Sequence, residues 1–236
     1  MKKITSCLII CSLLILGCNK DKKEPIEIEY GTGVDNDGRT FTTIKIGDQW
    51  WMAENLASSR FQNEDTIQYL SRENALSTWN AQNHSTYTFH NDSLFGYLYN
   101  FQCVEDTRKI APKGWKIPSD EDWKILEKHI GMSTEAANAF GWRGVEEANL
   151  LTTKYSSGWP EFSPLYGIDK YGFNARPGGC ITLLNFMNTG ANTAFWWTST
   201  QDNNEGYYRY IDFQQTRILR SKISKLYGMS IRCIKE

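Results

Sequence analysis

Carboxylate side chains are the residues of this chain best suited to catalysis, because glycoside hydrolysis needs two of them facing each other. Four acids lie in polar segments of the second half: Asp169, Asp202, Glu205 and Asp212. The distance between two carboxyl groups decides whether they can cleave a glycosidic bond, and the sequence does not give that distance. The acids therefore leave a polysaccharide hydrolase open without favouring it.

The histidines are not spaced for a metal site. His84 and His90 are six residues apart in a segment predicted to be a strand, which separates them by about 20 Å. Ligands of one zinc ion each lie only about 2 Å from the metal. His129 ends a predicted helix, where a cation is favourable. Because no recognised zinc, phosphate-binding or nucleophile motif is present either, we predict no metal site and no catalytic residue.

A helix is strongly signalled within residues 110–130, IAPKGWKIPSDEDWKILEKHI. Ser119 is placed to cap it, with Asp122 three residues later as the acid of a capping box. One face is apolar at the helical period, formed by Trp123, Leu126 and Ile130. The acids of the first turn suit the positive end of the helix dipole. We therefore interpret them as capping residues rather than catalysts.

Strand-like segments lie on both sides of this helix. Residues 41–46 alternate after a turn at Asp37-Gly38, and a second turn at Gly47-Asp48 leads into residues 49–53, which predicts a hairpin. Further strand-like runs cover residues 87–90, 96–101, 194–198, 207–213 and 229–234, and a short helix is predicted over 72–79. Strands, helices and then strands again predict an α+β fold.

The N-terminus has the features of an export signal. Lys2 and Lys3 precede an apolar run, residues 4–16, that is too short to span a bilayer of about 30 Å. The sequence Ile15-Leu16-Gly17-Cys18 resembles a bacterial lipobox, which predicts removal of residues 1–17 and lipidation of Cys18. More than one acyl chain anchors a protein stably. The alternative is an ordinary signal peptide with an incidental cysteine.

The mature chain divides into a tether and one domain. Residues 18–32 are polar and are predicted to be a flexible tether, and residues 33–236 have the length of a single domain. Loss of residues 1–17 changes the net charge from −1 to −3. Acids and bases are interspersed without a basic stripe, so nucleic acid is not expected as a partner.

Several ordered motifs carry a family resemblance. They are TIKIG (43–47), QWWMAENL (49–56), GYLYN (96–100), APKGWKIPSDEDW (111–123), WWTST (196–200) and SIRC (230–233). Together they resemble the Fibrobacter succinogenes major paralogous domain family of bacterial surface lipoproteins. The resemblance implies a fold similar to C-type lectins and formylglycine-generating enzymes: a small twisted antiparallel sheet, one or two helices and long aromatic-rich loops. It implies no catalytic position.

The resemblance also bears on the cysteines. Many members have a cysteine at the position of Ala111, where it could pair with a C-terminal cysteine. Cys103, Cys180 and Cys233 are the cysteines left in the mature domain, so at most one disulfide forms within it. We expect Cys103–Cys233, because Cys103 precedes the helix from the same side as the family cysteine. Cys180–Cys233 and three free thiols remain open.

Lectin-like relatives can place a calcium and sugar site in the region that follows the WWTST motif. The resemblance therefore makes ligand-binding candidates of Trp196, Trp197, Asp202, Asn203, Asn204 and Glu205. A solvated loop is the simpler explanation of the four polar residues. Calcium is the one cofactor that such a loop suggests, and we predict no other.

The functional expectation is a non-enzymatic binding module for a glycan or a protein, held on the bacterial outer membrane by its N-terminal lipid and exposed at the cell surface. Aromatic and amide side chains in loops would make the contacts. The alternative is a polysaccharide hydrolase that uses a pair of loop carboxylates.

Overall fold

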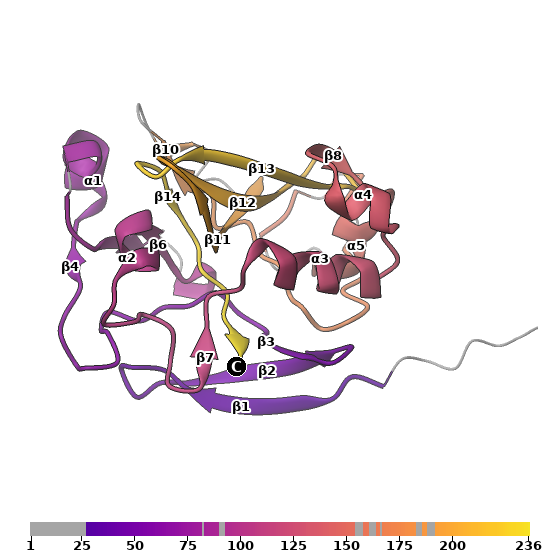
Figure 1. Ribbon diagram of the computed structural model, residues 1–236, viewed down its shortest axis with the longest axis horizontal. Coiled ribbons are helices and arrows are strands. Elements are labelled where there is room, and N and C mark those ends of the chain that lie inside the picture. Colours follow the sequence, from indigo (N-terminus) through magenta and orange to yellow (C-terminus); the bar gives the residue numbers. More distant parts are fainter. Residues whose placement is uncertain are drawn as a thin grey trace, which may run out of the picture.

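The computed structural model describes residues 27–81, 83–89, 93–153, 158–160, 164–165, 167–182, 186–187 and 192–236. These residues form three mainly antiparallel sheets with short helices between them (Figure 1). The α+β class is confirmed. The expectation of one small sheet with one or two helices is wrong, because strands distant in sequence pair into additional sheets.

The first sheet contains both ends of the domain. Its order is β1 (Tyr30–Val34), β2 (Thr40–Ile46), β3 (Gln49–Met52), β15 (Ile234–Lys235) and β7 (Trp115–Lys116). The two predicted turns are confirmed: Gly38 and Gly47 have φ angles of 81° and 60°, which glycine adopts without steric cost.

The predicted tether boundary at residue 32 is wrong. Tyr30 pairs with Ile44 and Thr32 with Thr42, so β1 belongs to the folded sheet. The polar composition of residues 18–32 hid this strand, since its outward side chains are exposed and only pairing with β2 orders it.

The second sheet has the order β10 (Phe186–Met187), β9 (Cys180–Ile181), β14 (Gly228–Met229), β6 (Tyr97–Asn100), β5 (Thr86–Phe89) and β4 (Gln68–Tyr69). The pairing of β4 with β5 is parallel and the others are antiparallel.

The predicted short helix is confirmed as α1 (Arg72–Thr78), followed by the 3-10 turn η1 (Trp79–Ala81). A second 3-10 turn, η2 (Ser93–Phe95), precedes β6. Leu70, Ala75, Trp79, Leu98 and Ile181 form a small core between α1 and this sheet.

The third sheet has the order β11 (Thr193–Asp202), β12 (Glu205–Asp212), β13 (Ile218–Ser224) and β8 (Gly141–Arg143). Three helices lie beside it in Figure 1: α3 (Asp120–His129), α4 (Thr134–Asn138) and α5 (Glu147–Leu151). The remaining helix, α2 (Phe101–Glu105), directly follows β6. None of the helices in the described ranges is long and apolar enough to span a bilayer.

Helix α3 connects the first and third sheets through aromatic contacts. The ring of Trp123 lies 5.1 Å from that of Trp51 in β3 and 5.8 Å from that of Trp196 in β11, measured between centroids. Phe173 closes the cluster at 5.8 Å from Trp123. Each buried ring removes about 150–250 Å² from water, so this cluster is a large part of the core.

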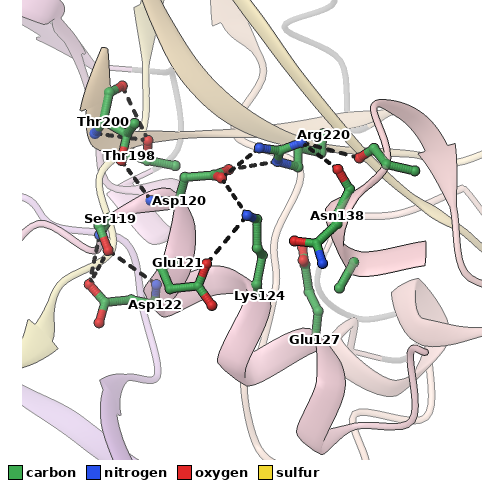
Figure 2. Close-up of polar contacts among 12 residues, drawn as sticks. Ser119, Asp120, Glu121, Asp122, Lys124, Glu127, Asn138, Thr198, Thr200 and Arg220 are labelled. Carbon is green, nitrogen blue, oxygen red and sulfur yellow. Dashed lines mark hydrogen bonds and ion pairs between the residues drawn. The ribbon is translucent and has the colours of Figure 1, made fainter. Parts of the chain in front are cut away.

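The capping box of α3 is confirmed. Ser119 Oγ accepts a hydrogen bond from Asp122 N at 3.1 Å, and Asp122 Oδ2 accepts one from Ser119 N at 2.8 Å (Figure 2). Substituting such a cap costs about 0.5–2 kcal/mol.

The interpretation of Asp120 as only a capping acid is incomplete. Its Oδ1 lies 2.8 Å from Arg209 Nη1 and its Oδ2 lies 2.7 Å from Arg220 Nη2, the contact shown in Figure 2. Burial opposes ionisation of Asp120, but hydrogen bonds and charge from Arg220 and Arg209 hold its pKa well below the ordinary value. Asp120 is therefore a counter-ion of the core.

Glu127 lies about two turns after Asp120 on the same face of α3 and extends this ion network. It is fully buried, with Oε2 at 2.6 Å from Arg143 Nη1 and Oε1 at 2.7 Å from Arg209 Nε. Burial lowers the pKa of Arg143, against the attraction of Glu127. Removing one member of such a buried pair costs about 3–5 kcal/mol, because the remaining charge is left unpaired. Asp120 and Glu127 are thus buried structural residues that a substrate cannot reach.

Candidate functional site

The predicted ligand loop is a tight hairpin turn that a lysine neutralises. Asp202 and Glu205 face each other at the ends of β11 and β12, and Asn203 and Asn204 form the turn. Lys222 Nζ lies 2.7 Å from Asp202 Oδ2 and 2.9 Å from Glu205 Oε2. Hydrogen bonds to both carboxylates raise the pKa of Lys222. The ammonium group therefore takes the position between the carboxylates that a calcium ion would need.

The two tryptophans beside this loop are core residues. Trp196 and Trp197 expose 1% and 0% of their surface. The indole nitrogen of Trp196 donates to Asn55 Oδ1 at 2.8 Å, and that of Trp197 donates to Tyr99 O at 3.0 Å. The prediction that they contact a ligand is wrong, because a sugar cannot stack on enclosed rings.

The predicted disulfide is absent. Cys103, Cys180 and Cys233 are buried free thiols of the same hydrophobic cluster. Burial raises the pKa of Cys180 to about 12 and raises those of Cys103 and Cys233 further. Because the thiolate is the reactive form, the three side chains act as small apolar groups. Cys18 lies outside the described residues.

Of the four acids named for hydrolysis, Asp202 and Glu205 face each other but are joined by Lys222, and Asp212 and Asp169 lie elsewhere. Asp212 lies seven residues along β12 from Glu205, about 23 Å for an extended strand, whereas glycosidase carboxyls are about 5–10 Å apart. Its carboxylate accepts a hydrogen bond from Tyr210. Asp169 lies in a separate loop, where Oδ1 accepts from Asn174 N at 2.9 Å.

The histidines likewise show no metal site. His129 packs its ring 6.0 Å from Tyr171, and His84 contacts Gln68. His90 lies outside the described residues, and within those residues no three histidine, cysteine or acidic side chains are grouped as a metal would require.

Sequence reasoning missed a row of aromatic rings on the second sheet, which we call the aromatic face: Tyr69, Tyr87, Phe89 and Tyr97. Tyr69 and Phe89 stack with centroids 5.3 Å apart and planes 9° apart. Tyr87 and Tyr97 stack at 4.8 Å and 21°. Tyr69 and Phe89 each expose 44% of their surface. Exposed rings grouped in this way are unusual in a monomer and mark binding sites.

Strand register places these rings on one side of the sheet. Tyr69 pairs with Tyr87 across β4 and β5, and Phe89 pairs with Tyr97 across β5 and β6. Alternate residues of a strand point to opposite faces. Thr88 pairs with Leu98, which belongs to the small core under α1, so the rings lie on the other face of the sheet. The alternation of Tyr87 and Phe89 was visible in the sequence, but which face is covered was not.

Polar groups border the aromatic face on the side of the first hairpin. Arg39 lies with its guanidinium carbon 5.5 Å from the centroid of the Tyr97 ring, and its Nη1 lies 3.4 Å from Tyr97 Oη. Asp37 holds Arg39 Nη2 at 3.1 Å and Ser59 Oγ at 2.7 Å. Burial opposes ionisation of Asp37, but the hydrogen bonds from Ser59 leave its pKa lowered. Rings with charged and hydroxyl groups beside them suit a ligand that has apolar faces and polar edges.

Comparison with known families identifies the domain. A family model described as the Fibrobacter succinogenes major domain matches residues 44–235. The chain belongs to this family. The membership predicted from the ordered motifs is thereby confirmed. Searches of curated proteins and of solved structures returned no match.

All four rings of the aromatic face lie within the Fibrobacter succinogenes major domain, whereas Arg39 and Tyr30 precede the matched residues. The face is therefore built by the family domain, and the β1–β2 hairpin adds polar groups at its border.

Proposed function

We propose that the protein is a non-enzymatic surface module that binds a glycan on its aromatic face. The observation that carries the proposal is the same-side row of two exposed rings, Tyr69 and Phe89, and two partly buried rings, Tyr87 and Tyr97, with Arg39 beside it. A sugar ring has C–H faces that pack on aromatic rings and hydroxyl edges that hydrogen-bond to charged side chains. Three neighbouring strands span about 10 Å, which suits roughly two sugar units.

The size of the aromatic face supports a glycan over a protein partner. An aromatic side chain offers about 150–250 Å² in all, so four partly exposed rings offer on the order of 300 Å². A specific protein interface needs about 800 Å² on each partner. A protein ligand would have to recruit much additional surface.

The proposed location is the bacterial outer membrane, facing outward. Lipidation of Cys18 would anchor the chain, and the residues from Cys18 to the start of β1 would span at most roughly 40 Å when extended. A C-type-lectin-like fold is part of the proposal, supported by the first and last strands of the described residues, β1 and β15, belonging to the same sheet.

A polysaccharide hydrolase is the second candidate. The observation in its favour is a polar pocket of about 370 Å³ that contains two carboxylates, Glu54 and Asp169. Burial raises the pKa of Asp169, as general acids of glycosidases require. Release of reducing ends from xylan, mannan or β-glucan, abolished by Glu54→Gln, would establish this function instead of binding alone.

The test of the binding proposal uses the full lipidated chain in detergent on an array of defined polysaccharides and oligosaccharides, with and without calcium. We expect binding to at least one glycan. Phe89→Ala and Tyr69→Ala should each weaken it about tenfold, which corresponds to about 1.4 kcal/mol, with unchanged thermal unfolding.

Phe140→Ala is the matched control, because Phe140 is 53% exposed but precedes β8 of the third sheet. It should bind as the unmodified protein does. Binding to no glycan under either condition, or equal binding by the aromatic-face variants, would overturn the proposal.

A further inference from the structure

The polar pocket lies where the outer face of the first hairpin meets the loops around residue 170. Its wall includes Tyr30, Thr42, Glu54, Asp169, Asn174 and Arg176. Tyr30 is 61% exposed, and its hydroxyl lies close to Gly172, at 3.2 Å from where a Cβ of residue 172 would be. One exposed aromatic ring thus stands at the border of a hollow lined with hydrogen-bonding side chains.

Main-chain contacts fix the two carboxylates. Glu54 Oε1 accepts from Thr42 N at 2.9 Å, and Asp169 Oδ1 accepts from Asn174 N at 2.9 Å. Because these backbone donors come from β2 and from the residue-170 loop, the carboxylates are held in place before any ligand arrives. Preorganised polar groups lower the ordering cost of binding.

The charges around the pocket balance. Arg232 is fully buried behind it and donates to neutral acceptors, namely Asn55 Oδ1 at 2.8 Å and the carbonyl oxygens of Phe173 and Asn174. Glu54 and Asp169 supply the negative charge that acts on this guanidinium, and Arg176 adds a second positive charge. Two carboxylates and two guanidinium groups give a region of no net charge. Such a region favours an uncharged ligand over a metal ion or a phosphate.

A smaller hollow borders the polar pocket at Glu54. It has a volume of about 160 Å³ and is lined by Arg39, Thr40 and Glu54 among others. Glu54 is common to this hollow and the polar pocket, and Arg39 reaches Tyr97 of the aromatic face. Polar groups therefore continue from the rings, past Arg39 and Thr40, to Glu54.

We propose that the polar pocket is a second sugar subsite, so that the module binds an extended, uncharged polysaccharide with one unit in the pocket and others on the aromatic face. This inference rests on the proposed glycan function. Carboxylate and guanidinium groups accept from and donate to sugar hydroxyls, and Tyr30 offers a ring for stacking. Two linked subsites bind a long ligand more tightly than either subsite alone, since the second contact is intramolecular.

The experiment measures affinity against ligand length by calorimetry on the full chain, using the uncharged oligosaccharides of whichever array polysaccharide binds. Affinity should rise steeply at the length that reaches both subsites. Glu54→Gln and Arg176→Gln should each remove that rise, at least tenfold in affinity for long ligands, and leave short ligands unaffected. Glu54→Gln keeps an oxygen for Thr42 N, so folding is preserved.

Glu121→Gln is the control, because Glu121 is 61% exposed on α3. Wild-type affinity of the pocket variants for long ligands would overturn the second subsite while leaving the aromatic face as a binding site. Preference for uronic-acid polymers over uncharged ones would overturn the uncharged ligand. The expected tenfold loss of affinity in Phe89→Ala, together with an unchanged length dependence in Glu54→Gln, would show that only the primary proposal holds.

Discussion

The ion network around α3 and the aromatic face of the second sheet both depart from the usual distribution of side chains. The first buries charged residues, and the second exposes aromatic ones. Charged residues normally lie outside and large aromatic residues are mostly buried. Here Glu127 and Arg209 are fully buried while Tyr69 and Phe89 are exposed. The buried charges of this network have partners of opposite sign, so the fold accounts for them. The rings of Tyr69 and Phe89 stack on each other, and a ligand would cover their exposed surface.

Breaking the network should give the largest effect. In Glu127→Gln, the neutral amide leaves Arg143 and Arg209 without their shared counter-charge, and we expect the free energy of unfolding to fall by about 3–5 kcal/mol. Denaturant unfolding followed by tryptophan fluorescence measures it. Glu121→Gln on the same helix should change stability little. A loss below about 1 kcal/mol in Glu127→Gln would mean that water reaches these charges.

Acid should weaken the same network through Asp120. Its pKa in the folded protein lies below the ordinary value of 3.8, so its contribution to stability is full above that value and is lost as the pH falls towards the folded pKa. The melting temperature of the unmodified protein should drop across this range. Asp120→Asn should melt lower at neutral pH and lose less on acidification. Parallel pH profiles for the two proteins would contradict this account.

Substitutions in the aromatic face should lower glycan affinity and leave stability nearly unchanged. Phe89→Ala removes an exposed ring, so the free energy of unfolding should change by no more than about 0.5 kcal/mol. Glycan affinity should still fall as described above. Calorimetric melting and array binding measured on the same preparation separate the two effects. A large loss of stability would instead assign the face to the core.

The hairpin turn at residues 202–205 should give the smallest effect. Lys222→Ala removes an exposed ammonium group that spans two exposed carboxylates, and we expect no resolvable change in melting temperature. Calcium should not alter the melting of the unmodified protein, because Lys222 already neutralises Asp202 and Glu205. A calcium-dependent rise in the unmodified protein would restore the turn as a metal site.

The predictions that succeeded rest on local chemistry. The α3 capping box, the turns at Gly38 and Gly47 and the helix at residues 72–78 depend on residues close in sequence. Family membership was also visible, because ordered motifs survive without any three-dimensional information. The failures concern burial: Trp196 and Trp197 looked like ligand contacts, and Asp120 looked like a surface cap.

The disulfide failed for a related reason. The pairing of Cys103 with Cys233 was inferred from a family pattern whose cysteine is replaced here by Ala111, and the thiols are free within one hydrophobic cluster. Being near each other in a core does not fix the Cβ geometry that a disulfide needs.

The sequence by itself determined the capped helix α3, the β2–β3 hairpin, the short helix α1 and the family, since capping, turn chemistry and period-2 alternation act over a few residues. Only the tertiary structure decided which face of each strand is covered. β11 is enclosed along Trp196 and Trp197, whereas β4 and β5 leave Tyr69 and Phe89 in contact with solvent. The physical reason is that burial depends on packing partners distant in the chain, such as α3 for the third sheet and α1 for the second.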